Sequence, residues 1–109
     1  MISSDAIRGY NDTIILYLLL EEPSYGYEIS RRIREISQGL YPIKETTLYS
    51  TFTRLEKGGY ISSFYGEESA GRRRTYYRVT REGEEYYRQK VREWEAIRDV
   101  VDRFIKKEE

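Results

Sequence analysis

The chain has 109 residues, 19 basic and 19 acidic side chains, and neither histidine nor cysteine. This length suits one domain, and the proportions of charged (35%) and hydrophobic (39%) residues are typical of a folded protein. The missing His and Cys remove imidazole bases, thiolate nucleophiles and almost every transition-metal site with nitrogen or sulfur ligands, and the remaining carboxylates lie among basic residues, where solvated ion pairs are usual. We therefore expect no enzyme, no metal site and no cofactor.

The sequence gives no sign of a membrane or secretory segment. Its longest apolar run, residues 14–20, is far shorter than the ~20 residues that span a bilayer, and no basic-then-apolar signal segment opens the chain. We therefore expect a cytoplasmic protein with no membrane partner.

The net charge of zero hides an uneven distribution. Residues 44–81 hold eight basic and four acidic side chains, a net +4, whereas residues 1–43 and 82–109 each carry −2. DNA-binding domains are usually basic, so the total charge argues against DNA. A local positive patch can nevertheless meet phosphates while acidic flanks face elsewhere.

Two helices are predicted in the first 40 residues. The first covers residues 6–20 and ends before Pro23, and Ser24 is a candidate N-cap for the second, over residues 25–37, which stops at Gly39. The first helix is apolar on more than one face, which predicts burial both by its own domain and by a partner. The inward stripe predicted for the second helix consists of Ile29, Ile33 and Ile36.

A third helix is predicted over residues 45–57, ended by Gly58 and Gly59. Its inward side chains are Leu48, Phe52 and Leu55. Lys44 stands at its N-cap position, where Ser, Thr, Asp or Asn is expected, so the free backbone N–H groups need another acceptor, such as a phosphate or water.

The last third predicts a β-hairpin and a long helix. Residues 60–65 and 75–79 are rich in β-branched and aromatic residues and predict two strands with a long tip over residues 66–74. Thr80 is the predicted N-cap of a final helix that continues to about residue 106. Its apolar side chains recur at a mean spacing close to the 3.5-residue repeat of a coiled coil, which favours pairing with another chain over folding back on its own domain. They are Tyr87, Val91, Trp94, Ile97, Val101 and Phe104.

Three helices followed by a hairpin is the order of a winged helix-turn-helix, in which the third helix enters the major groove and the wing contacts the backbone or the minor groove. We therefore predict an α+β fold, mostly α, with a DNA-binding domain over residues 1–79. Residues 80–109 form a dimerisation helix packed with the first helix as one unit. The predicted dimer interface consists of Ile14 and the six apolar residues of the final helix.

The outward side chains of the third helix are mostly short hydroxyls, which can approach phosphates and base edges closely. Three consecutive arginines in the hairpin are fixed cations suited to phosphates or to the minor groove. Without DNA, the same helix residues would simply form a solvated face. The predicted DNA-binding residues are Lys44, Thr46, Thr47, Tyr49, Ser50, Thr53, Arg54, Arg72, Arg73 and Arg74.

Four motifs, in this order, resemble the PadR-type transcriptional repressors: YGYEI (25–29), TLY with RLEKGGYI (47–49 and 54–61), GRRRTYY (71–77) and TREG (80–83). The resemblance covers nearly the whole chain. With one helix after the wing, the chain is similar to the short subfamily, and most like its lactococcal multidrug-sensing member. The resemblance implies a homodimeric repressor that binds a pseudo-palindromic operator in double-stranded DNA.

The resemblance also implies an effector site. In that subfamily the last helix packs on the first and last helices of the partner and leaves a pore, where a tryptophan of each subunit stacks on flat aromatic ligands. Trp94 occupies the matching position, and the ligand-binding residues so implied are Trp94, Tyr17, Thr13, Asp12 and Ile97. Arg98 stands where the multidrug-sensing relative has an acidic residue, and a cation there disfavours positively charged ligands.

Two other interpretations stay open. In the first, the protein binds DNA without an effector and Trp94 is structural, as a tryptophan in a helical seam usually is. In the second, the winged helix is a protein-interaction module, which a net charge of zero allows. The second predicts that neutralising the wing arginines leaves affinity for the partner unchanged.

Overall fold

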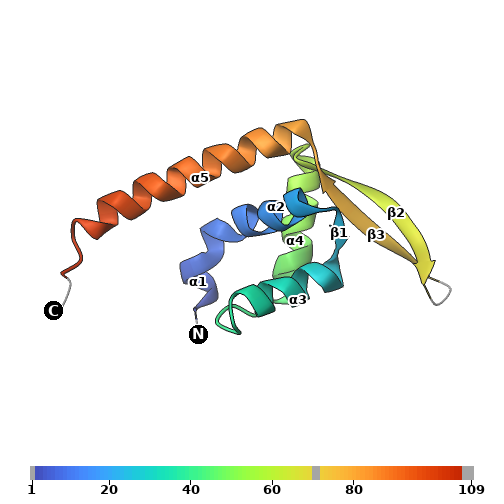
Figure 1. The fold of residues 1–109 in the computed structure, drawn as a ribbon, viewed down its shortest axis with the longest axis horizontal. Coiled ribbons are helices and arrows are strands. Elements are labelled where there is room, and N and C mark those ends of the chain that lie inside the picture. Colours follow the sequence, from blue (N-terminus) through green and yellow to red (C-terminus); the bar gives the residue numbers. More distant parts are fainter. Residues whose placement is uncertain (1, 70–71, 107–109) are drawn as a thin grey trace.

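A computed structural model describes residues 2–69 and 72–106, and the side chains of residues 2–66 and 73–106. The structure is mostly helical with one small antiparallel sheet, which confirms the predicted α+β class (Figure 1). The elements follow in the order α1 (Ser4–Ile7), η1 (Arg8–Tyr10), α2 (Asn11–Glu21), β1 (Ser24–Tyr25), α3 (Gly26–Ile36), α4 (Glu45–Lys57), β2 (Ile61–Ser69), β3 (Arg72–Val79) and α5 (Arg81–Asp102).

The predicted first helix is divided into three pieces. The α-helical hydrogen bonding of α1 gives way to the 3-10 turn η1, which contains Gly9, a poor helix former, and α2 starts afresh at Asn11. The core residues of α2 are Ile15, Leu16, Leu18 and Leu19. Figure 1 shows α2 between α5 on one side and α3 on the other, so its apolar surface is used on more than one face.

Helix α3 begins later than predicted, and fewer of its isoleucines are buried than predicted. Ser24 is not its cap but lies buried in β1, paired with Tyr77 of β3, because the sheet takes up the backbone groups there. Ile29 and Ile33 are buried, whereas Ile36, in the last turn, is 60% exposed and so was wrongly predicted to lie inward. The predicted stop is confirmed, because Gly39 has φ +78° and donates its N–H to the Arg34 carbonyl at 2.8 Å.

Helix α4 spans the residues predicted for it. Leu48, Phe52 and Leu55 are buried, together with Thr51, whose hydroxyl donates to the Thr47 carbonyl at 2.7 Å. Its N-cap, Lys44, makes no capping bond through its side chain, as its residue type predicts.

The three strands lie in the order β1-β3-β2, all antiparallel. The strands β2 and β3 are longer than predicted: pairing runs from Ile61–Val79 to Ser69–Arg72, with an irregularity between Tyr65 and Glu68. The long tip predicted over residues 66–74 is therefore wrong, apart from residues 70–71, which lie outside the described residues. The Tyr77 ring stacks on the Phe52 ring with their centroids 4.2 Å apart, and this contact fixes the base of the hairpin to the core.

Helix α5 begins after Thr80, whose side chain accepts the Gly83 N–H at 3.0 Å, and this confirms the predicted N-cap. It ends at Asp102, about four residues before the predicted end. Its first half packs on α2, and its second half extends beyond the rest of the chain (Figure 1). No helix in the described part of the chain is long and apolar enough to cross a membrane.

Candidate nucleic-acid interface

One face of α4 is exposed and rich in hydroxyl groups. Its members follow the i, i+3, i+4, i+7 spacing of a helix face, and they are Thr46, Tyr49, Ser50 and Thr53. The Ser50 and Thr53 hydroxyls donate to the Thr47 and Tyr49 carbonyls, each at 3.0 Å. These hydroxyl hydrogens are therefore occupied, which leaves the oxygens as acceptors toward solvent.

Tyr49 is held by a residue that sequence reasoning did not connect with it. A Cβ on Gly26, the first residue of α3, would overlap the Tyr49 hydroxyl, so the glycine leaves room for the Tyr49 ring in this position. The Tyr49 ring also meets Phe52 edge-on at 5.8 Å. A recess of about 470 Å³ beside it is lined by both Tyr49 and Arg74, and thus joins α4 to the hairpin.

The cations of the hairpin lie over aromatic rings. The guanidinium carbon of Arg74 is 4.4 Å from the centroid of Tyr25, and that of Arg78 is 4.1 Å from the centroid of Phe64. These contacts hold the arginines in place while leaving them exposed to solvent. Arg78 follows Arg74 and Tyr76 at i+4 and i+2, the spacing of one strand face, and this spacing could have pointed to it. The side chain of Arg72 lies outside the described side chains.

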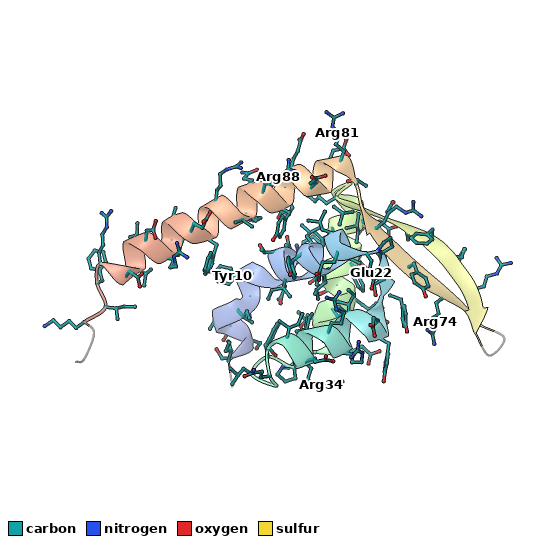
Figure 2. All side chains as sticks on the ribbon, in the orientation of Figure 1. Tyr10, Glu22, Arg34, Arg74, Arg81 and Arg88 are labelled. Carbon is teal, nitrogen blue, oxygen red and sulfur yellow. The ribbon has the colours of Figure 1, made fainter. Side chains whose placement is uncertain are left out.

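Arg74 and the arginines of α5 face different ways. Figure 2 shows Arg74 projecting from the hairpin on the side of α3, whereas Arg81 and Arg88 project from α5 on the opposite side of the molecule. Arg81 and Arg88 therefore do not extend the surface from which Arg74 projects.

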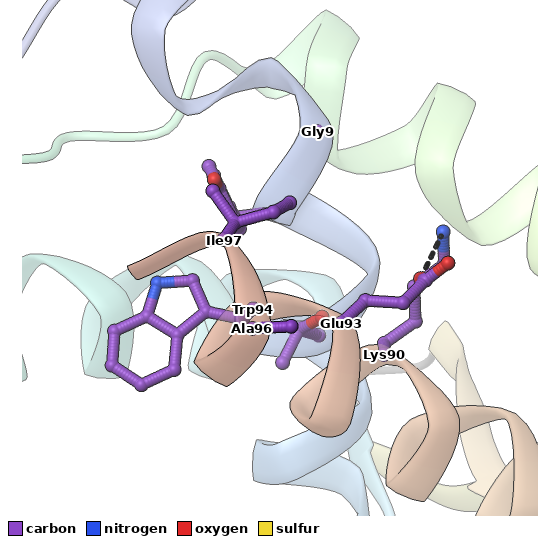
Figure 3. Close-up of a pocket in the computed structure, with 8 residues that line it drawn as sticks. Gly9, Lys90, Glu93, Trp94, Ala96 and Ile97 are labelled. Atoms are coloured by element: carbon purple, nitrogen blue, oxygen red, sulfur yellow. Dashed lines mark ion pairs between the residues drawn. The ribbon is translucent and has the colours of Figure 1, made fainter. Parts of the chain in front are cut away.

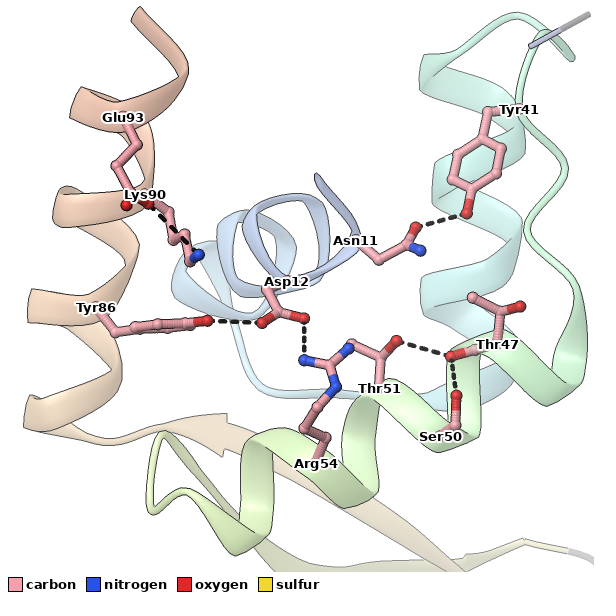
Figure 4. Close-up of polar contacts among 10 residues, drawn as sticks. All are labelled: Asn11, Asp12, Tyr41, Thr47, Ser50, Thr51, Arg54, Tyr86, Lys90 and Glu93. Carbon is pink, nitrogen blue, oxygen red and sulfur yellow. Dashed lines mark hydrogen bonds and ion pairs between the residues drawn. The ribbon is translucent and has the colours of Figure 1, made fainter. Parts of the chain in front are cut away.

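Arg54, at the edge of the hydroxyl face, reaches toward α2. Its Nη1 donates to Oδ1 of Asp12 at 2.6 Å, and Tyr86 donates its hydroxyl to Oδ2 of the same carboxylate at 2.8 Å (Figure 4). Burial, and then the bond to Asp12, raise the pKa of Tyr86, so its hydroxyl stays protonated. The structure thus joins two residues that sequence reasoning had assigned to separate sites, Arg54 to DNA and Asp12 to the effector.

An open recess of about 550 Å³ lies between α5 and the turn before α2. Three of the residues assigned above to a hypothetical effector site, Trp94, Ile97 and Thr13, line this recess, and Figure 3 shows Trp94 and Ile97 projecting from α5. Tyr17 instead lines a neighbouring apolar recess of about 350 Å³, which Thr13 also borders. Asp12 lines neither recess, because its carboxylate is turned toward Arg54 and Tyr86.

Charged side chains surround the Trp94 recess. Lys90 lies 3.4 Å from Glu93, both on its rim, and the guanidinium carbon of Arg98 lies 4.9 Å from the Trp94 ring. Among the described residues, no group of three or more acidic side chains is arranged to hold a metal ion.

The predicted interface residues form a continuous strip. The strip is half-buried within the chain at Ile14, Tyr87 and Val91. It is exposed to solvent from Trp94 onward, and the exposed fraction of Phe104 is 81%. Ile14 and Tyr87 also line the smaller apolar recess, next to Tyr17. Apolar surface therefore continues from α5 onto α2.

Residues 15–89 match the sequence profile of the PadR-like family of transcriptional regulators. The chain belongs to this family. The PadR-like protein is similar in structure to a transcriptional regulator from Clostridium thermocellum, at 63% identity and a TM-score of 0.90, with 97% of this chain and 100% of that chain covered. It is also similar to a PadR family transcription regulator from Clostridium difficile, at 36% identity and a TM-score of 0.76, with 87% of this chain and 97% of that chain covered.

A third relative is an uncharacterized protein of Lysinibacillus sphaericus, 46% identical over 105 residues, with 96% of each chain covered. Membership of the PadR-like family makes the fold a winged helix and the protein a DNA-binding transcriptional regulator. In this PadR-like regulator, α4 takes the place of the recognition helix and β2–β3 that of the wing.

Proposed function

We propose that this PadR-like regulator is a homodimeric repressor that binds a pseudo-palindromic operator. The recognition helix α4 of each subunit enters one of two successive major grooves, roughly 34 Å apart. The observation that carries this proposal is the recess lined by both Tyr49 and Arg74, because it places the hydroxyl face of α4 and the wing beside one another, where a single duplex can contact both.

The proposed contacts divide by chemistry. The hydroxyl oxygens of Ser50 and Thr53 can accept from the amino groups of adenine or cytosine, whereas the wing arginines meet phosphates or the minor groove. Lys44 stands at an uncapped helix start, where a phosphate can accept from the backbone N–H groups. The complete set is Lys44, Thr46, Thr47, Tyr49, Ser50, Thr53, Arg54, Arg72, Arg73 and Arg74.

The proposed dimer uses the apolar strip of α5, which is most exposed in the second half of that helix, together with Ile14 of α2. A strip of exposed large apolar side chains is unusual on a monomer and is typical of an interface. In this arrangement residues 1–79 form the DNA-binding domain and residues 80–109 the dimerisation helix. The interface comprises Ile14, Tyr87, Val91, Trp94, Ile97, Val101 and Phe104.

The proposed effector is a planar aromatic molecule that stacks on Trp94 between the subunits, in keeping with the resemblance to the short, multidrug-sensing PadR proteins. Lys90 is paired with Glu93 on the rim, so Arg98, which lies over the Trp94 ring, is the charge that disfavours cations relative to neutral or anionic compounds. Such a molecule releases DNA only to the extent that it binds one dimer state more tightly than the other. Quenching of Trp94 fluorescence by planar aromatic compounds of each charge tests this step, and no quenching by any of them contradicts it.

Fluorescence anisotropy tests the DNA-binding proposal. Wild-type protein is titrated into a duplex from its own upstream region and into a random duplex, across salt, beside an Arg73/Arg74→Ala variant. We expect the wild type to prefer the upstream duplex, and the variant's salt slope to fall by about one for each lost phosphate contact.

The matched control is an Arg81/Arg88→Ala variant, which removes the same charge from the opposite side of the molecule and should leave the slope nearly unchanged. Equal, weak binding to both duplexes by the wild type would contradict the proposal and favour a protein-interaction module. Repression itself is tested by a reporter gene under the same upstream region.

A further inference from the structure

A single buried carboxylate connects three helices. Asp12, in the first turn of α2, is only 8% exposed, and both of its oxygens are engaged. Oδ1 accepts from Arg54 of α4 at 2.6 Å, and Oδ2 accepts from Tyr86 of α5 at 2.8 Å (Figure 4). The recognition helix and the C-terminal helix therefore meet at one charged group.

Arg54 is placed to act on DNA while Asp12 holds it. It follows Ser50 by one helical turn and stands at the edge of the hydroxyl face, and its side chain is 58% exposed. A guanidinium has five N–H donors in a rigid fork, so the bond from Nη1 to Asp12 leaves donors for a phosphate or a guanine. An arginine already held in one orientation loses less conformational entropy when it binds.

Tyr86 connects the same carboxylate to α5. Its ring stacks on Tyr60, just after the end of α4, with centroids 4.1 Å apart and planes 8° apart, and Lys90 Nζ lies 5.4 Å from its centroid. The ring is fixed by these contacts, so its hydroxyl meets Asp12 only while α5 keeps this position.

We propose that Asp12 is a positioning residue for DNA recognition, which orients Arg54 of the recognition helix and links that orientation to α5 through the Tyr86 hydroxyl. The inference rests on the proposed DNA contact of Arg54. Beyond the proposed function, it states that the strength of the contact between Arg54 and DNA depends on the position of α5. A purely structural network would stabilise the fold and leave the DNA affinity of the folded protein unchanged.

A double-mutant cycle separates these roles. The wild type, Tyr86→Phe, Arg54→Ala and the double variant are titrated by anisotropy into the upstream duplex and a random duplex, well below their melting temperatures. Tyr86→Phe keeps the stacked ring and removes only the hydroxyl. We expect it to weaken binding to the upstream duplex roughly threefold to tenfold in the wild-type background, and to have almost no effect in the Arg54→Ala background.

Asp12→Asn gives an independent test. This change keeps the shape of the side chain and removes its charge. We expect binding to the random duplex to stay the same or tighten, because an anion has been lost near the phosphates, while the preference for the upstream duplex falls. Loss of that preference in Asp12→Asn, whose amide fills the same space, is the expected signature of positioning by charge.

Tyr41→Phe is the matched control. The Tyr41 hydroxyl is buried and donates to Asn11, the residue before Asp12 on α2, at 2.5 Å, but it does not touch Arg54. Its loss should lower the melting temperature without changing duplex preference. The inference is overturned if Tyr41→Phe and Tyr86→Phe change the duplex preference equally. It is also overturned if Tyr86→Phe has its full effect in the Arg54→Ala background. In both cases the proposed DNA-binding function still stands. A wild type that does not distinguish the duplexes overturns the proposed function, and this inference with it.

Discussion

Gly83 shows how a single residue can oppose the general rule for its type. In the first turns of a helix, a Gly→Ala change normally stabilises by roughly 1 kcal/mol. Here a Cβ on Gly83 would overlap the carbonyl oxygen of Tyr60, which is backbone and cannot move aside. We expect Gly83→Ala to destabilise the fold by roughly 2 kcal/mol, measured as a lower urea midpoint.

The control for that change is Gly9→Ala, because nothing lies within 4 Å of a Cβ at Gly9. This variant should be neutral or slightly stabilising. A Gly83→Ala protein as stable as the Gly9→Ala protein would contradict the close packing of α5 on Tyr60.

Thr80 stabilises the start of α5 in two ways at once. Its hydroxyl accepts from the Gly83 N–H at 3.0 Å and donates to the Gly59 carbonyl at 2.6 Å, so it caps α5 and ties it to the end of α4. We expect Thr80→Ala to lower the free energy of unfolding by about 1 kcal/mol in a urea titration. Thr80→Ser keeps the hydroxyl and should recover most of the loss; failure to do so would assign the effect to the methyl group.

At the scale of whole elements, the exposed apolar strip in the second half of α5 predicts that the protein is a dimer. Trp94→Glu places an unpaired charge in the proposed interface. The free energy needed to desolvate this charge exceeds the free energy gained from the remaining contacts. We expect the wild type to sediment as a dimer and the variant as a monomer at the same concentration. Gln89→Glu adds the same charge on an exposed part of α5 outside the strip and should stay dimeric; two dimeric variants would show that the interface lies elsewhere.

Elements set by local signals were predictable, and those set by distant contacts were not. The bounds of α4 follow from its apolar spacing and the glycines after it. In contrast, β1 is two residues long and exists only because β3 lies beside it. Gly66 indicated a loop, yet it lies within β2, where a Cβ would overlap the Tyr76 ring, so this glycine serves the packing of the hairpin.

The candidate site divides in the same way. The hydroxyl face of α4 and the wing arginines were recognisable from residue type and spacing. The pairing of Arg54 with Asp12 was not recognisable, because the two residues are 42 positions apart and no local sequence pattern around either residue predicts the contact. Asp12 had been assigned to the effector site, and only the packing of α2 against α4 and α5 shows what its carboxylate contacts.

For the whole molecule, the residue content determines how stability depends on pH. With no histidine or cysteine, no side chain has an ordinary pKa between about 5 and 8. Burial raises the pKa values of Tyr41, Tyr77, Tyr86 and Tyr87. Above about pH 10 the unfolded chain therefore releases tyrosine protons that the folded chain retains, and this favours unfolding.

We expect the melting temperature to be nearly constant from about pH 6 to 9 and to fall steeply above about pH 10. Differential scanning calorimetry measures both ranges. Tyr86→Phe should make the alkaline fall less steep, whereas Tyr65→Phe, at an exposed position, should not. A transition near neutral pH would contradict this assignment of the titrating groups.

The two-residue strand β1 has a consequence for how the wing adapts to a duplex. At its base, β3 has a neighbour on both sides, whereas beyond Thr75 it has β2 alone, with the irregularity after Tyr65. Amide hydrogens near Tyr77 should therefore exchange with solvent far more slowly than those near Arg73. Adjustment to the width of a groove is then confined to the outer half of the hairpin, while its inner half holds the orientation set by the core.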